Sequence, residues 1–183
     1  MATILLTQSP AWLERVHIRT LRETDLPALE WDGEYKHFRR MYADIFQSAR
    51  KGRAVLWVAE VSGSGLIGQI FVQLTSARQE LADGGDRAYV YSFRIKPAYR
   101  GRGIGTRMLQ VVEADLARRN YRQITLNVAQ NNPEARRLYE IMGYRVSGVD
   151  PGKWSYLDEN GAQQNVHEPA WRMEKWIGTG RSS

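Results

Sequence analysis

The most constraining feature of this sequence is a glycine- and arginine-rich segment between a strand pattern and a helix pattern. It reads PAYRGRGIGTRML, residues 97–109. Residues 88–96 alternate as a β-strand does, and Pro97 ends that pattern. Residues 103–120 then repeat apolar side chains at helical spacing. A glycine-rich turn between a strand and a helix points backbone N–H groups and the positive end of the helix dipole at an anion, so the segment predicts an anion-binding loop.

Two common phosphate-binding loops do not fit this segment. A Walker A loop requires Lys and then Ser or Thr after its last glycine, whereas Thr106 and Arg107 follow Gly105 here. The dinucleotide fingerprint G-x-G-x-x-G also fails, because Gly101, Gly103 and Gly105 run as G-x-G-x-G. A tight turn without a ligand stays open as the structural alternative.

Length and composition predict one soluble domain. The chain has 183 residues, 43% of them hydrophobic and 25% charged, which suits a single globular unit over residues 1–177 with a flexible tail at 178–183. No apolar run is long enough to span a bilayer. No basic segment precedes the short apolar stretch in MATILLTQSP, so we expect no secretory signal and a cytoplasmic location.

Charge and cysteine content narrow the chemistry. The formal net charge is +6, and 21 of the 26 basic residues are arginine, whose planar fork suits phosphate groups. These arginines are scattered rather than gathered in a basic tract, so a nucleic-acid partner is not expected. The absence of cysteine excludes disulfides, thiolate metal sites and a cysteine nucleophile.

Periodicity predicts a mixed α+β layer structure with antiparallel strands first and a βαβ-like portion in the second half. The alternation in residues 88–96 predicts that Tyr89, Tyr91, Phe93 and Ile95 share one face. The expected elements are a strand at 16–21, two helical pieces in 22–52 with a break near residues 32–33, strands at 53–61, 66–76 and 88–97, a helix at 103–120, a strand at 122–129, a helix from 132 to 143, a strand at 144–149, and a hairpin around 158–161 followed by a last strand ending near 177.

Two spaced motifs resemble the signature of the GCN5-related N-acetyltransferases. The loop matches [Q/R]-x-x-G-x-[G/A], and NNPEARRLYEIMGY is similar to the motif N-x-x-A-x-x-x-Y-x-x-x-G-[F/Y]. The resemblance implies a mostly antiparallel central sheet of about six to seven strands, flanked on both faces by about four helices. The matching residues are Arg100, Gly103, Gly105, Asn132, Ala135, Tyr139, Gly143 and Tyr144.

The resemblance implies acetyl transfer from acetyl-CoA to a primary amine by direct attack in a ternary complex, with no metal. Backbone groups of Phe93, Arg94 and Ile95 would pair with the pantetheine arm, and one N–H there would face the thioester oxygen. Asn132 would contact the cofactor as well as cap its helix. The pyrophosphate would lie on Arg100, Gly101, Arg102, Gly103, Ile104, Gly105 and Thr106.

The resemblance also implies an acid and leaves the base open. Tyr139 occupies the position of the family's acid and would donate to the departing sulfur, packing on the sheet being the structural alternative. Tyr89 and Asn127 stand where relatives carry glutamate. The remaining candidates are Glu60 near the end of an inner strand, the pair His167-Glu168 at the start of the last strand, and a chain of water molecules.

The acceptor is not defined by the sequence. It is a small-molecule amine or a protein amine, and the protein is expected to be a monomer or a homodimer without membrane contact. A non-catalytic acyl-CoA-binding module or sensor with the same fold is the alternative function. Aromatic residues expected to wall the acceptor pocket, with core packing as their alternative role, are Trp31, Tyr35, Phe38, Trp154, Tyr156 and Trp171.

Overall fold

The structure is a computed structural model and describes residues 11–178. The expectations for the first ten residues and for residues 179–183 of the tail therefore lie outside the described part. Within residues 11–178, no helix combines the length and the apolar character that a membrane span requires.

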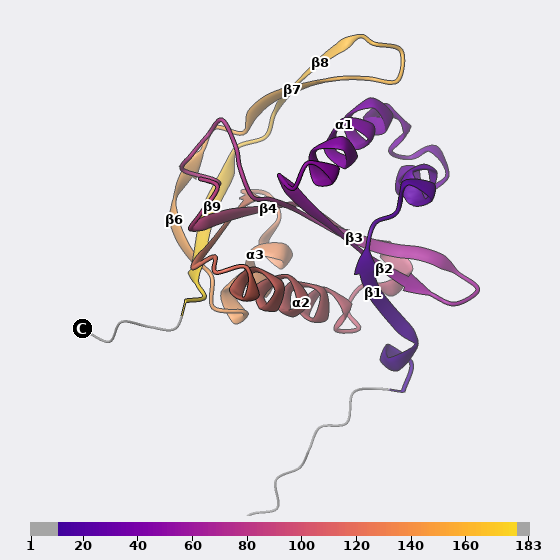
Figure 1. Cartoon of the computed structure of the whole chain (residues 1–183), viewed down its shortest axis with the longest axis horizontal. Coiled ribbons are helices and arrows are strands. Elements are labelled where there is room, and N and C mark those ends of the chain that lie inside the picture. The colour runs from indigo at the N-terminus through magenta and orange to yellow at the C-terminus, as the bar shows by residue number, and fades with distance from the viewer. Residues whose placement is uncertain (1–10, 179–183) are drawn as a thin grey trace, which may run out of the picture.

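A single mixed sheet forms the centre of the molecule (Figure 1). Among the strand pairs within residues 11–178, β4–β5 alone is parallel, so the expected mostly antiparallel sheet is confirmed. In sheet order the strands are β1 (Val16–Thr20), β2 (Ala54–Val61), β3 (Gly65–Gln73), β4 (Arg87–Ile95), β5 (Gln123–Ala129), β9 (Ala170–Trp176) and β6 (Arg145–Asp150), while β7 (Lys153–Leu157) pairs with β8 (Gln163–His167) in a separate hairpin.

Helices cover both faces of the sheet and bury two apolar clusters against it. Figure 1 shows α1 on one face and α2 with α3 on the other. Burial of this apolar surface is the main force that holds the layers together. The α-helices are α1 (Arg39–Arg50), α2 (Ile104–Arg118) and α3 (Pro133–Ile141), and the 3₁₀ segments are η1 (Leu13–Arg15), η2 (Glu23–Gly33), η3 (Lys36–Phe38) and η4 (Pro97–Tyr99).

The first helical piece is a 3₁₀ segment rather than an α-helix. The break expected near residues 32–33 is confirmed, because Trp31 and Asp32 both have positive φ, at 46° and 58°. L-residues rarely adopt this left-handed conformation, and it stops the helix. The turn brings Trp31 back onto the protein, where it is buried.

The prediction that Tyr89, Tyr91, Phe93 and Ile95 share one face is wrong. A bulge at Ser92, whose φ is 49°, inserts one extra residue opposite β3. Such a bulge reverses the alternation of side chains beyond it. Tyr91 therefore packs in the cluster under α1, whereas Phe93 and Ile95 pack in the cluster under α2 and α3.

The hairpin of β7 and β8 extends from the sheet toward α1 (Figure 1). Phe38 contacts Tyr156 and Trp154 of β7, with ring centroids 4.9 and 6.1 Å apart. Aromatic pairs at these distances stabilise the contact beyond simple area burial. The fold thus joins the N-terminal helical region to the C-terminal hairpin on the α1 face.

Candidate active site

The sheet opens where β4 and β5 separate. Residues Arg87–Val90 of β4 pair with residues Gln123–Leu126 of β5, and the pairing of these two strands ends there. The rest of β5 continues its pairing with β9 alone. Within the described residues, the edge of β4 that faces β5 therefore has no strand partner from Tyr91 to Ile95. Unpaired backbone groups at a sheet edge are ready to hydrogen-bond an extended ligand.

The glycine loop follows directly at the end of this open edge, and its glycines have two different roles. Gly101 and Gly103 have φ of +71° and +85°, and a Cβ at either would meet nothing within 4 Å. They allow the left-handed turns and leave the space above the loop open. A Cβ on Gly105, in contrast, would lie 3.3 Å from the Ile95 side chain and 3.5 Å from the Phe93 ring. Gly105 therefore permits close packing of α2 on β4.

The loop presents charge as well as backbone donors. Gly103 is the N-cap of α2 and provides no side-chain cap for its first turn. Arg100 donates from Nε to the Ile95 carbonyl at 2.8 Å, which braces the loop while the side chain stays exposed. Arg102 is also exposed and lies 5.4 Å from the Trp12 ring centroid. Ile104 is buried in the core, so only its backbone is available to a ligand.

Tyr139 of α3 lies beside the open part of β4. Its ring centroid is 6.4 Å from that of Phe93, and the side chain is buried. Among the described residues its hydroxyl has no hydrogen-bond partner. Burial, and to a lesser degree Tyr89, raises the pKa of Tyr139, so the phenol stays protonated at neutral pH. Asn132 accepts a hydrogen bond from the Ala135 N–H at 3.1 Å, which confirms its expected role as a helix cap.

The two positions that lack glutamate face the α1 side of the opening. Burial, assisted by Asp150, raises the pKa of Tyr89 to about 12, although Arg78, Arg172 and a hydrogen bond with Asn127 oppose the rise. The Asn127 Oδ1 atom is buried and has no partner among the described residues. Neither side chain accepts a proton readily at neutral pH.

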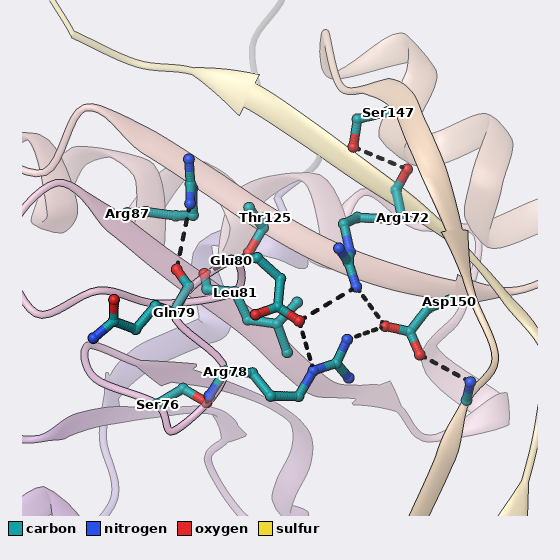
Figure 2. A network of polar contacts seen from close by, with 11 residues as sticks. Ser76, Arg78, Gln79, Glu80, Leu81, Arg87, Thr125, Ser147, Asp150 and Arg172 are labelled. Atoms are coloured by element: carbon teal, nitrogen blue, oxygen red, sulfur yellow. Dashed lines mark hydrogen bonds and ion pairs between the residues drawn. The ribbon is translucent and has the colours of Figure 1, made fainter.

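A buried carboxylate near Tyr89 was not predicted from the sequence. Asp150, only 1% exposed, accepts hydrogen bonds from Arg78 and Arg172 at 2.6 Å each (Figure 2). Burial alone would raise its pKa, but the two guanidinium groups and the Gly152 N–H hold the pKa well below its usual range. Asp150 is therefore a fixed anion and a poor base. Its partner Arg78 lies 72 residues away, so no local pattern revealed the pair.

The other base candidates belong to β2 and to the end of the β7–β8 hairpin. Glu60 is on β2 and forms an ion pair with Arg19 at 2.9 Å. His167 ends β8, and Glu168 lies in the connection to β9, which begins at Ala170; both are exposed. The pair therefore precedes the last strand rather than starting it.

An aromatic cluster on the α1 face includes most of the expected acceptor-pocket residues. Trp31 contacts Tyr35 at 5.1 Å between centroids, and Tyr35 stacks with Phe38 at 6.2 Å. Trp154 and Tyr156 contact the same Phe38. The placement of Trp171 in this wall is wrong, because its side chain packs with the cluster on the opposite face, under α2 and α3.

The side chain of Arg94 also belongs to this aromatic cluster. It extends over the Tyr35 ring, on the α1 face, with 4.2 Å between the guanidinium carbon and the ring centroid. The backbone of the same residue forms part of the open β4 edge. Backbone and side chain of Arg94 are thus available to two different ligands.

Known proteins resemble this chain in sequence or in fold. Yeast N-alpha-acetyltransferase 40 is 38% identical over 68 residues, 33% of this chain, and this chain spans 24% of that protein's length. The crystal structure of spermidine/spermine N-acetyltransferase SpeG from Vibrio cholerae has a TM-score of 0.67 at 20% identity, covering 91% of this chain and 95% of that one. The structure of Arabidopsis thaliana NAA60 in complex with acetyl-CoA has a TM-score of 0.66 at 22% identity, covering 88% and 98%.

The family assignment follows from a match over most of the chain. The profile described as "Acetyltransferase (GNAT) family" matches residues 18–144, from within β1 to the residue before β6. This range contains the open β4 edge, the glycine loop and Tyr139. The chain belongs to the GNAT family of acetyltransferases.

Proposed function

We propose that this protein transfers an acetyl group from acetyl-CoA to a primary amine by direct attack in a ternary complex. The observation that carries the proposal is the unpaired edge of β4 at Tyr91–Ile95, which ends at the glycine loop. An extended arm with two amides and a terminal pyrophosphate matches this sequence of backbone edge and anion loop. Family membership supports acyl transfer as the reaction.

The residues present suit the co-substrate. Backbone groups of Phe93, Arg94 and Ile95 would pair with the pantetheine amides as an added strand. The N–H groups of the loop from Gly101 to Thr106 would take the pyrophosphate, because the space above Gly101 and Gly103 is open. Arg100 and Arg102 contribute exposed positive charge there.

The chemistry divides between backbone and side chain. A β4 N–H beside the bulge would donate to the thioester oxygen as negative charge develops, a contribution of about 3 to 4 kcal/mol for a preorganised donor. The amine nitrogen bonds to the carbonyl carbon and the carbon–sulfur bond breaks. Tyr139 would donate its hydroxyl hydrogen to the departing sulfur and recover a proton from solvent.

The acceptor ammonium would lose one proton to water before it attacks, and its nitrogen would lose a second proton to water after the carbon–nitrogen bond forms. Tyr89 has too high a pKa to be ionised at neutral pH, and Asp150 is held by two arginines. Glu60 is paired with Arg19 on β2, and His167 and Glu168 are exposed at and just after the end of β8. An amine only a few pKa units above neutral needs little help to lose its proton.

Calorimetry with acetyl-CoA, followed by thiol release over a panel of amines, tests the proposal. The panel contains amino acids, peptides with free N-termini, lysine peptides and spermidine. Initial rates measured against both substrates should give intersecting lines, as a ternary complex requires, whereas parallel lines would indicate a covalent acetyl-enzyme. Tight acetyl-CoA binding without turnover on any amine would favour the acyl-CoA-binding module, and absence of binding would refute both.

A further inference from the structure

The guanidinium of Arg94 is a half-buried cation with little polar compensation from the protein. It lies 4.2 Å from the Tyr35 ring centroid and 5.2 Å from that of Phe38. Its Nη1 donates to the Tyr42 hydroxyl at 2.8 Å. None of the ion pairs found within residues 11–178 includes Arg94.

Two other partly buried arginines have carboxylate partners, whereas Arg87 and Arg107 donate to amide or carbonyl oxygens. Arg19 pairs with Asp25 at 2.6 Å, and Arg172 pairs with Asp150 at 2.6 Å. Burial of a charge is costly unless it is paired, and the contact with an aromatic face offsets only part of that cost. Arg94 is half-buried, and within residues 11–178 its guanidinium donates a hydrogen bond to Tyr42 alone, so most of its five N–H donors have no protein partner.

This cation lies on the side from which an acceptor would approach. The Arg94 side chain lies on the α1 face of β4, two residues after the bulge at Ser92, whereas Tyr139 approaches from the α3 side. The pKa of the Tyr35 hydroxyl is raised, chiefly by burial, while Arg94 opposes the rise and Glu34 adds to it. The site thus combines aromatic walls, a fixed cation and the proposed position of the thioester.

The surroundings carry charges of both signs, with Glu34 beside Tyr35 and a small basic excess in the neighbouring cavity. A surface cavity of about 450 Å³ borders the aromatic cluster through Trp31 and is lined by Lys36, Arg39 and Lys96. Its acidic residues are Asp32 and Glu30, and Glu30 is already paired with Arg39 at 2.7 Å. Arg94 does not line this cavity, which lies beside it. At the Arg94 side chain itself, an anion would meet an unpaired guanidinium, whereas a polycation would meet like charge.

We propose that Arg94 binds a carboxylate on the acceptor, so that the preferred substrates are amines whose molecule also carries a carboxylate rather than polyamines. The planar fork of arginine holds a carboxylate through two parallel hydrogen bonds, which positions the substrate as well as attracting it. This inference rests on the proposed acetyl transfer and specifies its acceptor. The carboxylate belongs to a free amino acid or to an acidic peptide.

A purely structural role for Arg94 makes a different prediction. Through Tyr42 and Tyr35 the side chain also links α1 and the segment after η2 to the sheet. Loss of such a link would lower the melting temperature and affect every acceptor alike. Carboxylate binding would instead affect acceptors according to their charge.

The test compares matched acceptors with the full-length protein and acetyl-CoA. One pair is phenylalanine and phenylalaninamide, and the other is the peptide amides Ser-Asp-Gly and Ser-Asn-Gly, so that the two pairs distinguish an amino acid from an acidic peptide. In Arg94→Met, kcat/KM for the carboxylate member of the preferred pair should fall about 10- to 100-fold relative to its neutral counterpart, mainly through KM, as loss of a charge-assisted pair implies. Arg94→Lys keeps the charge but not the planar fork, so the same relative kcat/KM should fall about 3- to 10-fold.

Arg50→Met is the matched control. Arg50 is exposed at the C-terminal end of α1, and the substitution removes the same charge from the same face. It should leave the ratio between the two members of each pair unchanged. The ratio within a pair also cancels differences in amine reactivity, because each variant is compared with wild type on the same two compounds.

Two outcomes would overturn the inference while leaving acetyl transfer intact. One is an equal fall on both members of each pair in Arg94→Met, accompanied by a lower melting temperature. The other is faster turnover of spermidine than of any carboxylate-bearing amine by the wild type. Failure of all acceptors would instead refute the proposed function, and this inference with it.

Discussion

The hydroxyl of Tyr139 can be removed without removing the ring packing around it. If this hydroxyl donates to the departing sulfur, Tyr139→Phe should lower kcat about 10- to 100-fold, the low end for general acids, because a thiol is a good leaving group. Acetyl-CoA affinity and melting temperature should stay nearly constant, since the hydroxyl has no partner among the described residues. Initial-rate kinetics, calorimetry and thermal melting measure the three quantities.

Tyr144→Phe is the control for this prediction. Tyr144 is a buried neighbour of Tyr139, 5.9 Å away between ring centroids, and its hydroxyl donates to Glu113 at 3.0 Å. Its removal should lower the melting temperature while kcat is retained. An unchanged kcat in Tyr139→Phe would refute the acid role without affecting the family assignment.

The pH dependence of turnover should be set by the acceptor rather than by a residue of the enzyme. Tyr89 titrates only near pH 12, and the pKa of Asp150 lies well below its usual range. If water takes the proton, kcat/KM should rise with pH until the pKa of the free amine is reached. Two acceptors, an α-amine of pKa about 8 and a lysine-type amine of pKa about 10.4, should therefore give pH profiles of kcat/KM whose rising parts are displaced by about two pH units. A rise in kcat/KM at the same pH for both amines would instead indicate a base on the enzyme.

At the scale of elements, the loop between β4 and α2 makes a prediction about cofactor affinity. Gly103→Glu places a carboxylate in the open space above the loop, where the pyrophosphate is proposed to bind. Like-charge repulsion and the occupied space should abolish acetyl-CoA binding, and wild-type binding should weaken as salt rises. Calorimetry at two salt concentrations measures both effects.

Gly63→Glu is the matched control for the loop. Gly63 lies between β2 and β3 with φ of +82°, and a Cβ there would also meet nothing within 4 Å. Both substitutions impose a similar backbone strain of about 1 to 2 kcal/mol. Only Gly103→Glu should affect acetyl-CoA binding, and equal binding by both variants would show that the loop does not hold the cofactor.

At the scale of the whole molecule, the Asp150 cluster joins parts of the chain that are distant in sequence. It connects the segment after β3 to β6 and β9 through Arg78 and Arg172 (Figure 2). Asp150→Asn should lower the free energy of unfolding at pH 7 by about 2 to 3 kcal/mol. This is less than for a fully buried pair, because the Arg78 side chain is 44% exposed.

The loss in Asp150→Asn should depend on pH. The pKa of Asp150 is lower in the folded chain than in the unfolded chain, so its contribution is complete above the unfolded pKa of about 3.9 and is lost as pH falls toward the folded pKa. The difference between wild type and variant in urea denaturation should therefore shrink from pH 7 to pH 3. Asp44→Asn, an exposed position on α1, should change stability by less than about 0.5 kcal/mol. A constant difference across this range would contradict the ion-pair explanation.

Local chemistry along the chain was sufficient to locate the strands, the main helices and the glycine loop. Strand and helix periods, Pro97 and the Asn132 cap each act within a few residues, so they can be identified without knowledge of the fold. The two family motifs are local in the same sense. The roles of the loop and of Tyr139 are still predictions, although the structure brings both to the open edge of β4.

Contacts between distant segments decided the rest. The bulge at Ser92 depends on the register between β4 and β3, and it reversed the faces expected for Phe93 and Ile95. Asp150 meets Arg78 across 72 residues, and Arg94 meets the ring of Tyr35 only because η2 and α1 fold back over the sheet. Side-chain alternation describes one strand at a time, whereas strand register, the partner of a buried charge and the environment of a cation are set by elements that the fold brings together.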